Sequence, residues 1–222
     1  MNIFRSPFFL PWLYPQLLWK VATTNKDIYL TFDDGPVPGP TEFVLEELRK
    51  AEAKATFFTI GDNVKKHPEV FQKIIAQGHG VGNHTFHHLS GWKTKKLKYL
   101  ENIQLCEDEM LQQSQGFVEP RRSEALFGAK GQQLFRPPYG RIKRSQIKLL
   151  NDYRIVMWDV LTHDYAQGLS PETCLQGAIK ATRPGSIVVF HDSIKAEKNM
   201  TYALPRYLSH FKNLGYSFKA LV

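Results

Sequence analysis

The alternation of short apolar runs with amphipathic helical patterns constrains the fold of this 222-residue chain more than any other feature. Between the runs, apolar residues recur every three or four positions, as in Leu97, Leu100, Ile103 and Cys106, which is typical of helices packed along one face. Another helical pattern is predicted over residues 64–75. This order predicts a parallel sheet with crossover helices, and seven runs favour an α/β fold of the distorted (β/α)7-type barrel, in a single domain. The expected strands are residues 28–32, 55–60, 80–83, 134–136, 154–160, 187–190 and 216–221.

Composition narrows the classes of protein that fit. The chain is 42% hydrophobic, which favours one sizeable core and argues against intrinsic disorder. Its net charge of +8 is interpreted as a generally basic surface. No basic stripe interleaved with aromatic residues indicates nucleic-acid binding, so no nucleic-acid partner is expected. Cys106 and Cys174 form no Cys-x-x-Cys pair and are predicted to be small core residues.

The first residues differ in composition from the rest. Residues 1–25 are predicted to be an N-terminal arm packed on a catalytic domain that covers residues 26–222, with a membrane-surface anchor as the alternative. Three prolines interrupt the apolar run, and no Ala-x-Ala cleavage site follows it, so neither a convincing signal peptide nor a transmembrane span is expected. We therefore expect a location in the cytoplasm or at the membrane periphery rather than export, although a cleaved export signal and the oligomeric state stay open.

Polar residues follow several of the expected strands. Asp33 and Asp34 come after the first strand, His84 after the third, the segment 136–139 after the fourth, and His191 after the sixth. The carboxyl ends of parallel strands meet at one edge of a sheet or one mouth of a barrel, where chemistry gathers in α/β folds. The sequence therefore predicts one common site.

The histidines near the third strand indicate a metal site. If a helix begins there, His84 and His88 lie one turn apart on one face, while His84 with His87 is a second possible pair. With Asp34 as a third ligand, two nitrogens and one oxygen leave a position open for water, as in a catalytic zinc site. Such an ion lowers the pKa of water to about 7. Asp33 then stays free as a general base.

Further residues are expected to serve this chemistry. Arg136 can orient Asp33 through a charge-assisted hydrogen bond, or it can form a surface ion pair of little value. Pro137 and Pro138 fix the backbone and can present the amide of Tyr139 to an oxyanion. His191 can protonate a leaving amine, and Asp164 can pair with it and raise its pKa.

Five segments together resemble the polysaccharide deacetylase family, carbohydrate esterase family 4. They are residues 31–36, 84–88, 136–140, 158–165 and 187–192, which stand in the family's order. The resemblance implies a distorted (β/α) barrel and a divalent metal, usually Zn²⁺, with Co²⁺, Ni²⁺ or Mn²⁺ as other possibilities. It implies hydrolysis of an acetyl group on a sugar.

The resemblance also implies a role for each matching residue. Asp34, His84 and His88 match the metal ligands, Asp33 the base and His191 the acid. Arg136 matches the residue that orients the base, and Asp164 the partner of the acid.

Some positions depart from the family's pattern. Tyr165 stands where Trp is frequent, and Val189 where Leu is common; with Trp158 and Pro138 they are expected to form the substrate pocket. The stretch 113–133 is longer than in the family and is predicted to be a surface loop that can reshape the groove.

The sequence therefore predicts a metal-dependent deacetylase of an N-acetylated polysaccharide or oligosaccharide. The alternatives are a hydrolase of a small amide or cyclic imide on the same fold, and a non-catalytic glycan-binding barrel. Neither the sugar, the chain length nor the native metal follows from the sequence.

Overall fold

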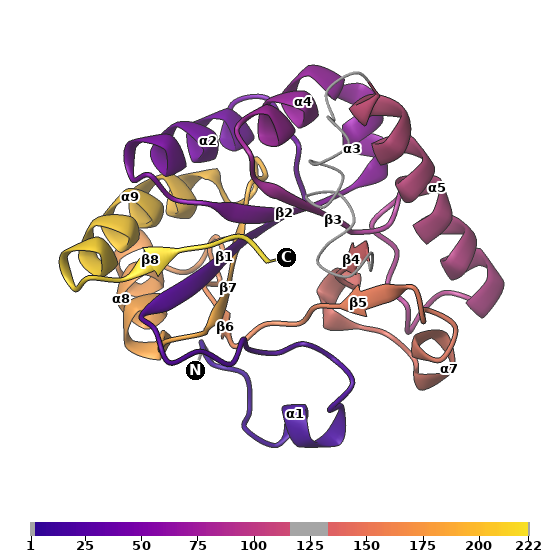
Figure 1. Cartoon of the computed structure of the whole chain (residues 1–222), viewed down its shortest axis with the longest axis horizontal. Helices are drawn as coiled ribbons and strands as arrows, with labels where there is room; N and C mark the ends of the chain where they lie inside the picture. Colours follow the sequence, from indigo (N-terminus) through magenta and orange to yellow (C-terminus); the bar gives the residue numbers. More distant parts are fainter. Residues whose placement is uncertain (1–2, 116–132, 222) are drawn as a thin grey trace.

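The computed structural model describes residues 3–115 and 133–221, and these form a distorted barrel of parallel strands surrounded by helices (Figure 1). The strands lie in the order β5-β4-β3-β2-β1-β7-β6, with β8 paired to the start of β1. The predicted α/β barrel is thereby confirmed. The strands are β1 (Asp27–Asp33), β2 (Ala55–Thr59), β3 (Gly80–Asn83), β4 (Gln133–Phe135), β5 (Tyr153–Ile155), β6 (Val160–Leu161), β7 (Ile187–His191) and β8 (Ser217–Phe218).

The helices cover the outside of the barrel and bury their apolar faces against it (Figure 1). Strand β1 lies in the middle of the sheet, where Leu30 pairs with Ala55 of β2 on one side and Val188 of β7 on the other. The helical segments are α1 (Leu10–Leu13), α2 (Pro40–Lys50), α3 (Gly61–Lys66), α4 (Pro68–Ala76), α5 (Lys96–Ser114), η2 (Pro138–Gly140), α7 (Arg144–Ile147), α8 (Pro171–Ala181) and α9 (Glu197–Asn213).

The expectation of one strand over residues 154–160 is wrong, because this segment forms two short strands at opposite edges of the sheet. The amide of Val156 donates to Phe135 on the β4 side, whereas the amide of Asp159 donates to Ile187 on the β7 side. The chain therefore crosses the gap between the two edges, and a continuous strand cannot pair with both.

Residues near the N-terminus fill the gap between β5 and β6. The amide of Leu18 donates to Ile155, and its carbonyl accepts from Met157. Further along the opening, Arg5 forms an antiparallel bridge with Val160, and its side chain pairs with Asp159. The N-terminal residues thus supply the backbone partners that close the barrel where β5 and β6 do not meet.

The helical pattern over residues 64–75 forms two helices instead of one. Helix α3 ends at Lys66, and α4 begins at Pro68, whose ring excludes the hydrogen bond that would continue α3. Helix α8 begins at Pro171, and the Ser170 hydroxyl before it caps the helix by accepting from the amide of Thr173.

The boundaries of two other predicted segments differ in the structure. Helix α5 extends to Ser114, so the first residues of the predicted loop 113–133 are helical, while residues 116–132 lie outside the described part of the chain. The expected last strand shortens to β8, which pairs with Asp27 and Ile28. Cys106 and Cys174 are buried and unbridged, as predicted for core residues.

Candidate active site

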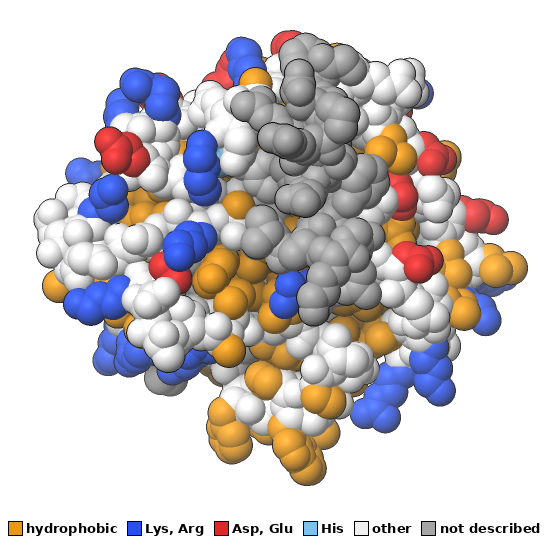
Figure 2. All heavy atoms as spheres, in the orientation of Figure 1, with side chains coloured by type: hydrophobic (Ala, Val, Ile, Leu, Met, Phe, Trp, Pro, Cys, Tyr) orange, Lys and Arg blue, Asp and Glu red, His pale blue; other side chains and the backbone are white. Residues whose placement is uncertain are grey.

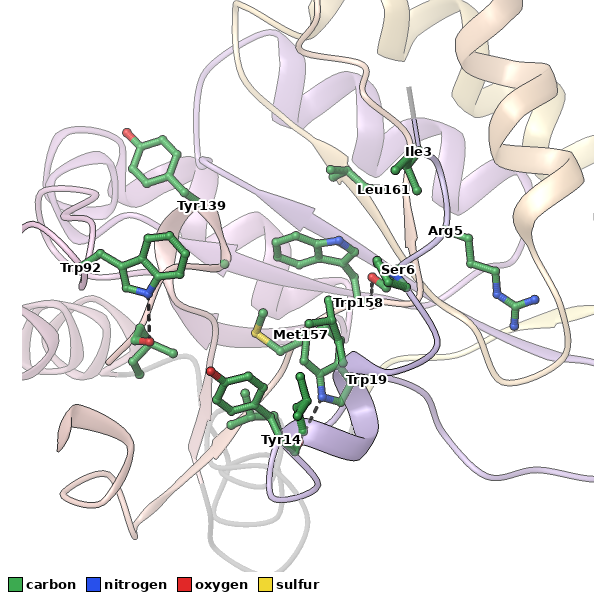
Figure 3. Close-up of a pocket in the computed structure, with 16 residues that line it drawn as sticks. Ile3, Arg5, Ser6, Tyr14, Trp19, Trp92, Tyr139, Met157, Trp158 and Leu161 are labelled. Atoms are coloured by element: carbon green, nitrogen blue, oxygen red, sulfur yellow. Dashed lines mark hydrogen bonds between the residues drawn. The ribbon is translucent and has the colours of Figure 1, made fainter. Parts of the chain in front are cut away.

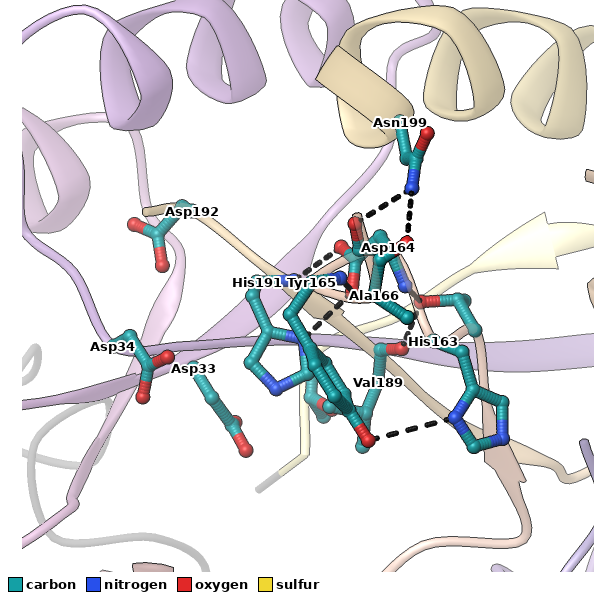
Figure 4. A network of polar contacts seen from close by, with 12 residues as sticks. Asp33, Asp34, His163, Asp164, Tyr165, Ala166, Val189, His191, Asp192 and Asn199 are labelled. Carbon is teal, nitrogen blue, oxygen red and sulfur yellow. Dashed lines mark hydrogen bonds and ion pairs between the residues drawn. The ribbon is translucent and has the colours of Figure 1, made fainter. Parts of the chain in front are cut away.

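The carboxyl ends of β1 and β7 bring two acidic residues beside a histidine (Figure 4). Asp33 ends β1 and pairs in register with His191, the last residue of β7. Asp34 follows with a φ of 80°, a left-handed conformation that turns its side chain out of the strand alternation. Two consecutive carboxylates therefore both reach the mouth of the barrel, where a regular strand would point one of them away.

Asp34, His84 and His88 lie together in a pattern that suits a divalent cation. Their potential ligand atoms all lie within 4.8 Å of one another. Asp34 Oδ1 is 3.2 Å from His88 Nε2 and 3.7 Å from His84 Nε2. The same Oδ1 atom is buried and has no hydrogen-bond partner among the described residues. A buried oxygen without a donor, flanked by two imidazole nitrogens, fits a metal ion with nitrogen and oxygen ligands.

The segment from His84 to His88 is a loop, so the expected helix that would place both histidines on one face is absent. Thr85 and His88 adopt positive φ values of 64° and 54°. The Asn83 side chain accepts from the amide of Thr85, and the Thr85 hydroxyl accepts from the amide of Leu89. This hydrogen-bonded turn, rather than helical periodicity, brings the two imidazoles into contact, with ring centroids 5.1 Å apart.

The turn also separates His87 from the group. The His87 side chain is exposed, and its Nδ1 lies 2.8 Å from the amide nitrogen of the Asn102 side chain. In contrast, the Nδ1–H of His84 donates to the carbonyl of Arg136, at 2.8 Å, which leaves Nε2 with its lone pair toward Asp34. Of the two histidine pairs that the sequence allows, the structure therefore brings His84 and His88 together at Asp34.

The protonation states of these groups suit metal binding. Burial lowers the pKa of His84 to about 4 and also lowers the pKa of His88. Burial alone would raise the pKa of Asp34, but the positive charge of His191, joined by those of His84 and His88 when they are protonated, brings it below its usual value. Near neutral pH the group therefore offers two neutral imidazoles and a carboxylate, the forms that bind metal ions.

Asp33 is held by a buried arginine. Arg136 Nη1 donates to Asp33 Oδ1 at 2.7 Å, and the guanidinium is completely buried. The remaining donors of Arg136 bond to the Thr31 hydroxyl and to backbone carbonyls. The interpretation of Arg136 as part of a surface ion pair is therefore wrong, and the buried pair fixes the direction of the Asp33 carboxylate.

His191 makes a second charged pair, with Asp164 (Figure 4). Its Nδ1–H and its backbone amide each donate to an Asp164 oxygen at 2.7 Å. Burial would lower the pKa of His191, but the charge and hydrogen bond of Asp164, with smaller effects from Asp34 and Asp33, raise it to about 9. His191 is therefore protonated at neutral pH, and its Nε2 can serve as an acid.

Asp33, His191 and the three candidate metal ligands line a cavity of about 490 Å³. Trp158, Tyr165 and Val189 line it, as expected of the substrate pocket, whereas Pro138 is buried at the start of η2 and does not reach it. Tyr139 stands at the rim with 60% of its surface exposed, and its ring centroid is 4.6 Å from that of His88.

The cavity also has lining residues that the sequence did not suggest. Arg141, Leu161 and Lys195 face it, and Lys195 Nζ lies 5.4 Å from the ring centroid of Tyr165. No local pattern marks Arg141 or Leu161. Lys195 stands four positions after His191 in the sequence, and this proximity is a weak signal that could have drawn attention to it.

Asp192 is a further residue that sequence reasoning missed, although it lies in a matching segment. Its buried carboxyl accepts from the amide of Gly35 at 3.0 Å and from the Thr41 hydroxyl at 2.6 Å, and burial raises its pKa to about 8. A Cβ atom on Gly35 would lie 2.0 Å from this carboxyl, so only glycine allows the close approach. Asp192 therefore braces the turn that carries Asp34.

Comparisons with known proteins agree with this arrangement. Residues 20–158 match the family model described as polysaccharide deacetylase. The chain is 34% identical over 204 residues to a peptidoglycan-N-acetylglucosamine deacetylase of Bacillus cereus, covering 90% of this chain and 88% of the relative. It is 32% identical over 178 residues to a chitooligosaccharide deacetylase of Azorhizobium caulinodans, covering 78% and 77%.

Solved structures show the same fold. The crystal structure of the Bc1960 peptidoglycan N-acetylglucosamine deacetylase superposes with a TM-score of 0.82 at 27% identity, over 97% of this chain and 95% of that one. A mutant of BA3943, described as a CE4 family pseudoenzyme with restored enzymatic activity, has a TM-score of 0.75 at 25% identity, over 90% and 67%. This chain therefore belongs to the polysaccharide deacetylase family, the hydrolases of carbohydrate esterase family 4.

Proposed function

We propose that this protein removes acetyl groups from N-acetylglucosamine units of a polysaccharide or oligosaccharide, in a reaction that requires a divalent metal ion. The observation that carries the proposal is the juxtaposition, in one cavity, of the Asp34–His84–His88 group with Asp33 and His191. The names of the relatives, which are deacetylases of peptidoglycan and chitooligosaccharides, support this substrate class.

Asp34, His84 and His88 would hold the ion, and two nitrogen ligands with one carboxylate favour Zn²⁺ over harder ions, with Co²⁺, Ni²⁺ and Mn²⁺ as the other candidates. When bound there, a metal ion would polarise water and the acetyl carbonyl. The buried Oδ1 of Asp34, which has no hydrogen-bond partner in the described part of the chain, supports this ligand set.

The chain's own residues supply the proton transfers. Asp33, fixed by Arg136, accepts a proton from the attacking water, and the amide of Tyr139 donates to the oxyanion that forms on the acetyl group. His191, kept protonated by Asp164, gives its proton to the sugar nitrogen as the C–N bond breaks. The products are acetate and a free amino sugar. Trp158, Tyr165 and Val189 would surround the acetyl methyl.

Family membership alone does not establish activity, since one structural neighbour is described as a pseudoenzyme. A non-catalytic glycan-binding barrel would be expected to lack the base or a ligand. In this chain the base, the acid, the buried arginine and all three candidate ligands lie within one site. None of the helices in the described residues is long and apolar enough to cross a bilayer.

Acetate release is the test of the proposed activity. Protein stripped with a chelator and then reloaded with Zn²⁺ or Co²⁺ is expected to release acetate from N-acetylated chitooligosaccharides or peptidoglycan fragments, and the stripped protein is not. Glycan binding by calorimetry with no acetate under any metal would instead favour a binding protein. Ring opening of a cyclic imide without acetate release would favour the small-amide hydrolase.

Asp164→Asn is expected to shift the alkaline limb of the pH–rate profile toward lower pH. The Asp164 carboxylate is what raises the pKa of His191 to about 9, and a general acid loses activity as the pH rises through its pKa. Without that charge the pKa falls, so the limb should move down by about one pH unit or more. The measurement is kcat/KM for acetate release between pH 6 and pH 10.

The acidic limb should change little in this variant, because Asp33 and the candidate ligands are untouched. An alkaline limb that stays in place would exclude His191 as the group that sets it.

A further inference from the structure

A second cavity lies beside the catalytic pocket, between α1 and the loops that follow β3 and β4. It has a volume of about 530 Å³ and opens along the N-terminal residues. Tyr14, Trp92, Tyr139 and Trp158 lie around it (Figure 3), and aliphatic side chains such as Leu13 complete the walls. We call it the α1 groove.

Four of the polar side chains that line the α1 groove already have partners within the protein. The indole N–H groups of Trp19 and Trp92 donate to the carbonyls of Tyr14 and Ile142 (Figure 3). The Ser6 hydroxyl donates to the carbonyl of Trp158, and Arg5 pairs with Asp159. These four groups are therefore not available to a sugar chain, whereas a hydrocarbon chain needs no hydrogen-bond partner.

The α1 groove adjoins the catalytic pocket. Tyr139, Trp158 and Leu161 line both cavities, so a molecule whose acetyl group lies near His88 can extend past these side chains into the groove. One ligand can therefore place a polar acetylated part in the first cavity and an apolar part in the second.

The outer side of α1 presents apolar side chains to solvent. Phe8 is 93% exposed and Trp12 is 80% exposed, and Phe9 beside them is partly exposed. Figure 2 shows the apolar side chains over α1 as a projection at the lower edge of the molecule. We call Phe8, Phe9 and Trp12 the α1 tip.

Basic side chains stand beside two aromatic residues of the α1 groove. The Arg144 guanidinium lies 5.3 Å from the ring centroid of Tyr14, and that of Arg141 lies 5.4 Å from that of Trp92. Exposed aromatic residues with cations behind them are the composition that enters the interface of an anionic lipid layer.

We infer that the α1 groove binds the hydrocarbon chain of an acetylated glycolipid, whose sugar occupies the catalytic pocket while the α1 tip contacts the lipid surface that presents it. This inference names a substrate class for the proposed deacetylase and so rests on that function. The aliphatic lining, the satisfied polar atoms and the shared wall at Tyr139, Trp158 and Leu161 all support it.

The test compares two glycosides of N-acetylglucosamine that differ only in the aglycone. The metal-loaded enzyme is given the methyl and octyl β-glycosides, both below the micelle concentration of the octyl compound, and acetate is measured. Each fully buried methylene favours binding nearly fourfold, so burial of about three or four of the additional methylenes would raise kcat/KM for the octyl glycoside by on the order of 100-fold. Equal kcat/KM values would overturn the inference and leave the deacetylase proposal intact.

A pair of leucine variants tests whether the preference for the octyl glycoside depends on the α1 groove. Leu13→Gln places an amide in the α1 groove and is expected to reduce the octyl-to-methyl ratio at least tenfold. Leu105→Gln changes a leucine of similar exposure on α5, 49% against 42%, outside the groove, and is expected to leave the ratio unchanged. An unchanged ratio in Leu13→Gln would remove the groove as the chain's binding site.

A binding measurement separates failure of the inference from failure of the function. Octyl glucoside has no acetamido group, and the metal-loaded protein is titrated with it and with methyl glucoside by calorimetry. Binding of the octyl compound alone, weakened in Leu13→Gln, would support the groove even if no glycan releases acetate. Absence of octyl binding together with acetate release would contradict the groove only.

The α1 tip is tested with vesicles of phosphatidylcholine and phosphatidylglycerol. The protein is expected to cosediment with them, and Phe8→Ser/Trp12→Ser to lose most of this binding, while Leu105→Ser/Leu214→Ser retains it. A concentration-dependent dimer that only the tip variant abolishes would assign the tip to a second copy of the chain and overturn the lipid contact.

Discussion

Asp33→Asn is expected to keep the metal ion and to lose nearly all turnover. The change removes the carboxylate that accepts the proton of the attacking water but leaves Asp34, His84 and His88 in place. Loss of a general base lowers kcat by about 100-fold to 10,000-fold. The measurement combines acetate release with the zinc content of the purified variant by elemental analysis.

The same variant should also be less stable. Arg136 is completely buried and would lose the charge of its partner. Breaking a buried ion pair by removing one partner costs about 3–5 kcal/mol of stability. This range is an upper bound here, because the amide oxygen introduced by the substitution can still accept a hydrogen bond from Arg136. Urea unfolding of the zinc-loaded protein measures this loss. Kinetics must therefore be recorded at a temperature where the variant is shown to be folded.

Asp62→Asn is the matched control for this experiment. Asp62 makes the same kind of charge-assisted contact, to Lys66, but on the exposed surface of α3 and outside the catalytic pocket. It should retain turnover and lose little stability, because exposed ion pairs contribute about 1 kcal/mol or less. Full turnover in folded Asp33→Asn would remove Asp33 from the role of base.

The sequence predicts the barrel and the position of the site because both depend on local patterns. Period and length identify β1, β2, β3 and β7 closely, and polar residues directly after them must meet at one mouth of a parallel barrel. His191 can thus be placed at the same mouth of the barrel as Asp33, while their pairing in register comes from the structure.

The parts that the sequence could not predict depend on contacts between distant segments. Residues 154–160 have the composition of one strand, but Met157 bonds to Leu18 near the N-terminus while Asp159 bonds to β7. Likewise the loop at His84–His88 is held by side-chain hydrogen bonds of Asn83 and Thr85 that compete with a helix. Local periodicity contains no information about either partner.

Supporting residues are harder to predict than the groups they support. Asp192, which follows β7 and is distant from Gly35 in the sequence, accepts a hydrogen bond from the turn after β1. The Thr41 hydroxyl donates to the same carboxyl from α2. Pro138 shows the opposite case, because its place in a motif suggested a pocket residue, whereas in the structure it is buried and does not line the cavity.

His88→Ala is expected to lose zinc, whereas His87→Ala is expected to keep it. His88 Nε2 lies 3.2 Å from Asp34 Oδ1, while the ring of His87 is hydrogen-bonded to Asn102 away from that oxygen. Removing one of three ligands should weaken zinc binding more than the roughly 10–100-fold that follows from losing a supporting hydrogen bond. Competition with a chromophoric chelator measures both affinities.

Comparing His88→Ala with His87→Ala tests the ligand set more decisively than a change at His84, which we also expect to abolish zinc binding. His84 is almost completely buried, so its removal can disturb folding and lower zinc content for that reason alone. The side chain of His88 is 25% exposed and that of His87 lies on the surface, so both can be shortened with little loss of packing. Equal zinc affinity in His87→Ala and His88→Ala would contradict the ligand set, and with it the metal-dependent chemistry, while leaving the barrel as the fold.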